Sequence, residues 1–355
     1  MVAPGVLNGD EAWALLNLCK EKGAALPAVN VSNSSTLNAT LETAAEVNSP
    51  VMIQLSKGGA EFYAGKSLDN GDLSASIQGA VAAARHTHVM AKAYGVPVIL
   101  HTDHCAKKLL PWIDALLDAG KEYYQSTGRP LYSSHMLDLS EEPLDENIAI
   151  SKAYFTKMRA LDMMIEIELG VTGGEEDGVD NTDIDQARLY TQPEEVGQAY
   201  AALGEVGVPF LVAAAFGNVH GVYKPGNVEL RPKILKACQK HISEKFSTPD
   251  DQPLNFVFHG GSGSSQADIR EAISYGVVKM NIDTDLQWAY WKGVRDFEAE
   301  NHDYLQTQIG NPAGEDQPNK KKYDPRTWLR AAEKTFVYRL TQAFDDLNAL
   351  DLHNR

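Results

Sequence analysis

The residues best suited to chemistry begin in segment 98–110, Val-Ile-Leu-His-Thr-Asp-His-Cys-Ala-Lys-Lys-Leu-Leu. This segment starts as an apolar run and brings His101, Asp103 and His104 close together. A neutral imidazole binds zinc, and a nearby carboxylate can accept and return a proton. The alternative is a histidine pair that only caps a core strand. For this cluster taken alone, the two interpretations carry about equal weight.

Two more of the ten histidines follow apolar runs in a similar way. His220 lies in Phe-Gly-Asn-Val-His-Gly, and His259 begins His-Gly-Gly-Ser-Gly-Ser. Three imidazoles with a fourth position open form a known catalytic zinc arrangement. Because these ligands are dispersed along the chain, no spacing rule tests them. Their positions alone predict a zinc site.

Such a site needs a scaffold that brings distant segments together. Eight short apolar, β-rich runs are each followed by a segment long enough for a helix. These runs are Ala25–Asn30, Val51–Ser56, Val96–His104, Leu131–Asp138, Met163–Gly170, Pro209–Asn218, Asn255–Gly261 and Val277–Asp283. Eight β-then-α units predict a TIM (β/α)8 barrel. A doubly wound sheet is the second choice, but no Gly-x-Gly-x-x-Gly turn follows the first run.

Catalytic side chains of such barrels lie at the carboxyl ends of the strands. Asp138 ends the fourth run. Glu166 and Glu168 alternate with apolar residues in the fifth, so both face the barrel interior and need cationic or metal partners. Lys279 shares a face with Asn281 in the eighth run. It could form a Schiff base, but an interior lysine paired to carboxylates is the simpler account.

Two loops have the composition of a phosphate site. Gly260-Gly-Ser-Gly-Ser264 follows the seventh run, and Asp283-Thr-Asp285 follows the eighth. Glycines let backbone N–H groups approach phosphate oxygens, and the loops after strands seven and eight are the usual phosphate site of this fold. An isolated sequence of this kind would favour a plain glycine turn. Its position in the barrel favours phosphate.

Several segments lie outside the repeating units. Residues 171–193 form an acidic connection expected to be a mobile active-site loop, although a solvated acidic loop is the commoner fate of such sequences. Residues from about 286 to 355 form an extension with helices around Leu286–Glu300 and from about Thr327 to Leu350, separated by a polar stretch. No linker indicates a second domain, so we expect a single domain over residues 1–355. The helix after the first histidine segment is expected to end at Gly120.

The composition limits the partners. A net charge of −16, from 32 Lys+Arg and 48 Asp+Glu, argues against nucleic acid or an anionic membrane as the main partner. Three cysteines, in no metal-type pair, fit a reducing compartment. No signal peptide or membrane-length apolar run is present in the sequence. We therefore expect a cytoplasmic location.

Seven blocks of the sequence, taken together, resemble one known family. They are HTDHCAKKLLPW, SSHMLDLSEE, EIELGVTGGEEDGV, FGNVHGVYKPGNV, FVFHGGSGS, VVKMNIDTD and GNPAGEDQPNKKKYDPR. In this order they resemble class II, metal-dependent fructose-bisphosphate aldolases of the longer bacterial and fungal form, from about Gly5 into the last helix. The resemblance implies reversible cleavage of fructose 1,6-bisphosphate to dihydroxyacetone phosphate and glyceraldehyde 3-phosphate. It also implies a homodimer that acts in glycolysis and gluconeogenesis.

The resemblance implies a metal site and roles in proton transfer. Zinc would bind His104, His220 and His259, with Asp138 and Glu168 close to the metal, where a second metal position also occurs. Asp103 would exchange a proton with the C4 hydroxyl during carbon–carbon cleavage. Glu175 would remove the C1 proton of dihydroxyacetone phosphate, with Glu176 as the less favoured choice. Asn281 would support the enediolate.

The resemblance also implies where the two phosphates bind. One would contact Gly221, Gly260, Ser262, Asp283 and Thr284, with a monovalent cation (K⁺ or Na⁺) nearby. Asn30, Ser56 and Arg326 would contact the other end of the bisphosphate, and Arg326 would come from the partner subunit. Two alternatives remain open. One is an aldolase for another ketose bisphosphate, such as tagatose bisphosphate, and the other is a zinc-dependent hydrolase, against which the phosphate loops argue.

Overall fold

The computed structural model describes residues 2–172, 174–176, 179–181, 189–219, 230–261 and 263–354, with the backbone alone for 174–176 and 179–181. Its centre is a closed barrel of eight parallel strands, in the order β4-β3-β2-β11-β10-β9-β6-β5, with β5 pairing back to β4. These strands are β2 (Leu26–Asn30), β3 (Val51–Leu55), β4 (Pro97–Thr102), β5 (Ser134–Leu137), β6 (Met164–Leu169), β9 (Phe210–Ala214), β10 (Phe256–Phe258) and β11 (Val277–Ile282). The predicted TIM barrel is confirmed, with one strand inside each of the eight runs.

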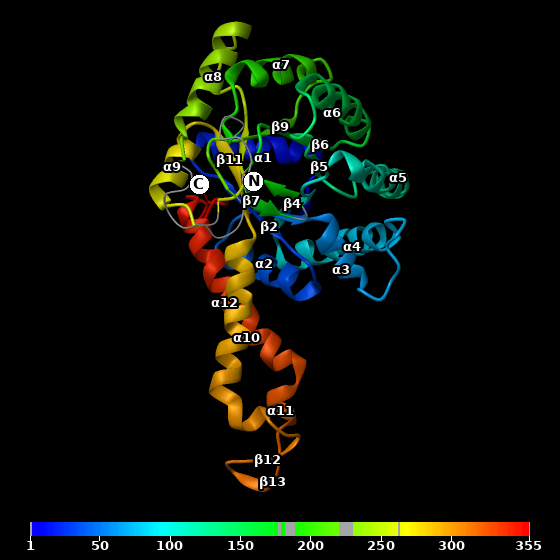
Figure 1. Cartoon of the computed structure of the whole chain (residues 1–355), viewed down its shortest axis with the longest axis vertical. Helices are drawn as coiled ribbons and strands as arrows, with labels where there is room; N and C mark the ends of the chain where they lie inside the picture. Colours follow the sequence, from blue (N-terminus) through cyan, green and yellow to red (C-terminus); the bar gives the residue numbers. More distant parts are fainter. Residues whose placement is uncertain are drawn as a thin grey trace.

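The helices mostly surround the barrel, and the last three extend into an arm that projects from it (Figure 1). They are α1 (Gly9–Glu21), α2 (Ser34–Glu46), α3 (Lys57–Ala64), α4 (Ser74–Tyr94), α5 (Leu110–Thr127), α6 (Leu144–Arg159), α7 (Pro193–Gly204), α8 (Lys233–Phe246), α9 (Gln266–Ser274), α10 (Thr284–Leu305), α11 (Lys320–Tyr323) and α12 (Pro325–Asp346). Polar residues define several of their starts. Asn8 and Glu11 form a reciprocal capping box at α1, and the side chains of Asn33 and Ser56 accept backbone N–H groups at α2 and α3.

The strands are shorter than the apolar runs that predicted them. Run Leu131–Asp138 yields only β5, because a short strand, β1 (Gly5–Val6), pairs with the beginning of β4. Strand β5 then pairs with the end of β4, from His101 opposite Ser134. The Ser133 hydroxyl donates to the carbonyl of Leu7 at 2.6 Å, which ties β5 to the segment after β1. Strand β1 lies outside all eight predicted runs.

The predicted end of α5 at Gly120 is wrong. Helix α5 continues to Thr127 and is closed by Gly128, which has a left-handed φ of +69°. Gly120 lies inside the helix on its buried side, and a Cβ added there would lie 3.7 Å from the Leu161 side chain. A glycine inside a helix is tolerated where packing compensates for its lower propensity. The first glycine after an apolar pattern was therefore mistaken for the C-terminal cap.

An arm projects from one side of the barrel (Figure 1). Helices α10 and α12 run side by side, and a hairpin of β12 (Ile309–Asn311) and β13 (Gly314–Pro318) follows α10. The two helices approach closely because Gly293 has no side chain, and a Cβ there would lie 2.3 Å from Thr335 Oγ1. The arm falls within the extension expected from about residue 286, although its hairpin lies in the stretch expected only to be polar. Among the described helices, none combines the length and apolar character needed to cross a membrane.

Candidate active site

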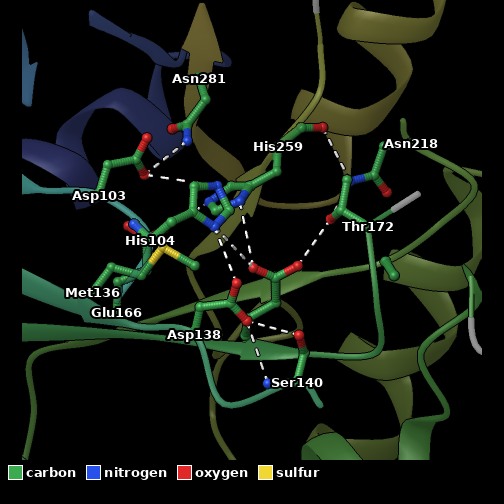
Figure 2. Close-up of polar contacts among 12 residues, drawn as sticks. Asp103, His104, Met136, Asp138, Ser140, Glu166, Thr172, Asn218, His259 and Asn281 are labelled. Carbon is green, nitrogen blue, oxygen red and sulfur yellow. Dashed lines mark hydrogen bonds and ion pairs between the residues drawn. The ribbon is translucent and has the colours of Figure 1, made fainter. Parts of the chain in front are cut away.

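Strand β4 delivers Asp103 and His104 to the mouth of the barrel. It ends at Thr102, and His104 adopts a backbone φ of +37°, in the region that favours glycine. The His104 N–H donates to Met136 Sδ at 3.4 Å (Figure 2). A histidine kept in this conformation stores backbone strain of order 1–3 kcal/mol, and such strain is concentrated at functional sites. His104 combines this conformation with a place at the mouth of the barrel.

Two carboxylates lie against the His104 ring. Its Nδ1 is 3.2 Å from Asp138 Oδ2 and 3.8 Å from Glu168 Oε2. Asp138 also accepts the Ser140 hydroxyl at 2.7 Å (Figure 2). Burial raises the pKa of Asp138, but the hydrogen bond and charge of His104 outweigh it and hold that pKa at about 2. Asp138 is therefore an ionised oxygen donor beside an imidazole.

His259 follows β10 and completes the cluster from another side of the mouth. Its ring centroid lies 4.7 Å from that of His104. His259 Nε2 is 2.8 Å from Glu166 Oε1, and Nδ1 is 3.6 Å from Glu168 Oε2. Burial lowers the pKa of His259, despite the opposing effect of Glu166. The neutral ring is the form that binds metals.

The donor set fits a divalent metal ion. One donor atom from each of Asp103, His104 and His259 lies within 4.8 Å of the others, and the same holds for His104, Asp138 and Glu168. Glu168 Oε2 is buried and has no hydrogen bond from the described residues. Burial and then the charge of Asp138 raise the pKa of Glu168 well above its usual range. A cation among these groups would balance the buried carboxylates.

Asp103 is held by three side-chain amides. Asn30 and Gln54 each donate to Oδ2 at 2.9 Å. Asn281 donates to Oδ1 at 3.1 Å (Figure 2). The carboxyl group is fully buried, which opposes its ionisation. The charges of His104, Lys279 and His259 and the amide of Asn30 outweigh burial, so its pKa lies below the usual value. Asp103 is thus an oriented carboxylate beside the metal-type donors.

Lys279 lies inside the barrel and faces Glu166. Its Nζ donates to the two carboxylate oxygens at 3.0 and 2.7 Å, and neither side chain is exposed. This ion pair supports the simpler account of Lys279 as an interior partner of a carboxylate. A Schiff-base lysine would need its amine available to the substrate.

Several predicted phosphate contacts line a cavity of about 600 Å³ between the barrel and the arm. Asn30, Ser56 and Asp283 all line it. Thr284 begins α10, whose N-terminus offers partial positive charge, and Gly260 has a φ of +58° directly after His259. Asp283 thus shares a cavity with Asn30 and Ser56, although the resemblance assigns these residues to opposite ends of the bisphosphate.

Some predicted residues cannot be placed or lie elsewhere. His220, Gly221 and Ser262 fall outside the described residues, as does the side chain of Glu175. The backbone of Glu175 belongs to β7 (Gly174–Glu176), which pairs antiparallel with β8 (Val179–Asn181). Arg326 lies in the first turn of α12 on the arm, where its side chain is 89% exposed and pairs with Asp324 at 2.6 Å.

Sequence reasoning missed Gln54. Its Nε2 donates to Asn30 Oδ1 at 2.6 Å as well as to Asp103, so it links two predicted site residues. Gln54 is the single polar residue in the run Val-Met-Ile-Gln-Leu of β3. A polar side chain within a fully buried strand is a signal that could have found it.

Fold and site together define a class of protein. A TIM barrel whose mouth gathers imidazoles and carboxylates around one point, beside a cavity with polar residues in its lining, is a metal-dependent barrel enzyme. A sequence profile described as "Fructose-bisphosphate aldolase class-II" matches residues 10–351. The fructose-bisphosphate aldolase of Campylobacter jejuni is 58% identical over 351 residues, which cover 99% of this chain and 98% of that protein. The class 2 enzyme of Escherichia coli K12 is 57% identical over 352 residues, with the same coverage.

A solved structure agrees with these matches. The crystal structure of the aldolase from Campylobacter jejuni superposes with a TM-score of 0.91 at 56% identity and covers 99% of this chain and 97% of that one. The chain belongs to the class II fructose-bisphosphate aldolase family. It is therefore a carbon–carbon lyase that requires a metal and acts on a sugar phosphate. The hydrolase alternative is excluded, and the relatives named above are fructose-bisphosphate aldolases.

Proposed function

We propose that the barrel mouth cleaves fructose 1,6-bisphosphate reversibly to dihydroxyacetone phosphate and glyceraldehyde 3-phosphate, with zinc held by His104, His259 and His220. The observation that carries this proposal is the joint approach of His104 and His259 to Glu168, whose buried Oε2 lies 3.8 and 3.6 Å from their Nδ1 atoms. A donor set rich in imidazole favours zinc over magnesium or calcium. Asp138 and Glu168 add oxygen donors next to the imidazoles.

The metal, when bound, supplies a Lewis acid that polarises the substrate ketone. Asp103 takes the proton of the C4 hydroxyl as the C3–C4 bond breaks, and it returns this proton in condensation. The amides of Asn30, Gln54 and Asn281 orient its carboxylate for this transfer. We also assign Asn281 to support of the enediolate, since its side-chain NH₂ can donate to a developing oxyanion and already donates to Asp103 at the site.

A glutamate of β7 exchanges the second proton, at C1 of dihydroxyacetone phosphate. Glu175 is our assignment. Glu176, the next residue of the strand, is the less favoured choice. The connection over about residues 171–193 closes over the substrate in this proposal and limits loss of the enediolate to water.

The phosphates bind at the rim. Asp283, Thr284, Gly260, Gly221 and Ser262 hold one of them, with K⁺ or Na⁺ nearby as a prediction that rests on the resemblance. Asn30 and Ser56 contact the other end of the substrate. Arg326 contacts that end from the partner subunit of a homodimer. The support for this is its own position, 89% exposed on a projecting arm. Single-domain organisation and a cytoplasmic location also stay predictions.

His104→Ala tests the proposal. The variant should lose both bound zinc and cleavage, because it removes a ligand that the backbone holds in a strained conformation. Zinc content of the purified protein and cleavage of fructose 1,6-bisphosphate are the two measurements. Zinc retained at one ion per chain would remove His104 from the ligand set.

A further inference from the structure

The two glutamates of β6 point into the barrel but have different surroundings. Glu166 Oε1 meets His259 Nε2 at 2.8 Å and Lys279 Nζ at 3.0 Å. Its Oε2 meets the same Nζ at 2.7 Å and lies 3.3 Å from His101 Nε2. Both Glu166 oxygens are therefore occupied by nitrogens of the protein. Glu168 differs, because its Oε1 accepts the Thr172 hydroxyl at 2.9 Å while Oε2 lies among the imidazoles of the site.

The pair of Glu166 and Lys279 spans the barrel interior. Strands β6 and β11 are not neighbours in the sheet, since β9 and β10 lie between them. Their side chains meet in a layer where neither is exposed. Two opposite charges in this setting balance each other, and removal of one partner would leave an uncompensated buried charge. The pair thus provides a fixed carboxylate next to His259.

A fixed carboxylate on one nitrogen of an imidazole decides what the other nitrogen can do. A carboxylate accepts hydrogen bonds, so Nε2 of His259 carries the hydrogen and donates it to Glu166. In the neutral ring, Nδ1 then carries the lone pair, on the side of Glu168 and His104. Carboxylates that hold metal-binding histidines in this way set ring orientation and ligand basicity.

We propose that Glu166, held in place by Lys279, is a positioning residue that fixes His259 with Nδ1 directed at the metal. This inference rests on the proposed role of His259 as a metal ligand. The two glutamates of β6 then have separate roles. Glu168 lies next to the metal, and Glu166 holds the ring of His259 in its orientation. Lys279 keeps Glu166 engaged on both oxygens, so this carboxylate does not turn to the metal itself.

The test measures zinc affinity of the full-length, metal-free protein, by competition between the protein and a chromophoric zinc chelator. Glu166→Gln keeps the size of the side chain but removes its charge. We expect zinc affinity to fall by about 10- to 100-fold, the usual effect of losing such a partner. Affinity within about twofold of the wild type in a folded Glu166→Gln protein would overturn the proposal, since the partner would then contribute less than this usual effect.

A double variant separates orientation from charge. Glu166→Gln alone leaves Lys279 unbalanced near the metal, and this charge could itself repel zinc. Glu166→Gln/Lys279→Met removes both buried charges. The double variant therefore also avoids the loss of stability that an unpaired buried charge causes. The proposal expects the double variant to keep the weakened zinc affinity. Recovery of wild-type affinity would overturn the proposal, because the effect would then belong to Lys279 and not to the orientation of His259.

Two further variants complete the design. Tyr132→Phe removes a buried hydrogen bond, from Tyr132 to the carbonyl of Ala80 at 2.7 Å, without touching the site. Tyr132→Phe should lower stability and leave zinc affinity unchanged. If its zinc affinity fell as much as that of Glu166→Gln, the effect of Glu166 would be one of general stability and the proposal would fail. His259→Ala should lose zinc outright. Wild-type affinity in that variant would refute the proposed function, which is a different failure from an unaffected Glu166→Gln.

Discussion

Replacing Asp103 by alanine should separate the two proton transfers of the reaction. Asp103 accepts hydrogen bonds from three amides, and its Oδ1 lies 4.0 Å from His104 Nε2. The substitution removes the group assigned to the C4 hydroxyl and leaves the imidazoles in place. Loss of a general base lowers rates by about 10²- to 10⁴-fold. We expect cleavage to fall by that factor while zinc stays bound.

The same substitution has a cost in stability that can be estimated from the contacts. Asn30, Gln54 and Asn281 each lose a charged acceptor, but Gln54 keeps its bond to Asn30, and Asn30 is only partly buried. The cost therefore falls mainly on the buried donor of Asn281, and one such unsatisfied donor costs about 1–3 kcal/mol. The free energy of unfolding in urea should therefore fall by about 1–3 kcal/mol. Activity must be measured under conditions in which the variant is folded, as judged by circular dichroism.

The decisive assay is exchange of the C1 proton of dihydroxyacetone phosphate with deuterated water, followed by NMR. This exchange needs the metal and the β7 glutamate but not the C4 hydroxyl, so Asp103→Ala should retain it. Bond cleavage, measured by coupled detection of the triose phosphates, should be lost in the same sample. Loss of exchange together with cleavage, at unchanged zinc content, would refute the division of roles between the two carboxylates.

Three other predictions concern the loop, the arm and the core. Glu175→Ala should abolish C1 proton exchange while Glu176→Ala retains most of it; the reverse pattern, seen in the same NMR assay, would move the role to Glu176. Arg326→Ala should raise KM for fructose 1,6-bisphosphate. If Arg326 acts across subunits, a mixed dimer with a His104→Ala chain has one intact site and should show about half the wild-type activity per dimer; no recovery would place Arg326 within its own chain. Burial, and then the charge of His101, lower the pKa of His135 from 6.5 to about 3. Between these values only the unfolded chain takes up the proton, so stability should fall as the pH falls below 6.5, by about 1.4 kcal/mol per pH unit for this residue. Urea unfolding of His135→Gln should show a shallower dependence, and an unchanged slope would contradict the shift.

The strands and the mouth of the barrel were predictable because apolar runs and polar strand ends are local features. Each predicted run contains one barrel strand, and Asp103 and His104 follow β4 as expected. The strand predicted over Leu131–Asp138 is longer than the observed β5. The reason is that β1, only two residues long, occupies the position beside the start of β4. A pairing between segments so far apart leaves no local pattern.

The separate surroundings of Glu166 and Glu168 show what the sequence could not reveal. Alternation placed both on one face of β6, but it contains no information about which one meets Lys279 across the barrel. Gln54 was missed for the same reason, since its partners Asn30 and Asp103 come from other strands. Gly120 shows the opposite error, in which a local cap signal was overridden by packing of α5 on the barrel.

The central claim is that cleavage depends on a metal and not on an imine. We would measure cleavage of fructose 1,6-bisphosphate by the purified protein before and after treatment with EDTA, after zinc is added back, and after borohydride with substrate present. The account predicts loss with the chelator, recovery with zinc and no effect of borohydride, because the amine of Lys279 is buried against Glu166. Activity that survives EDTA and is destroyed by borohydride would contradict it and transfer the chemistry to Lys279.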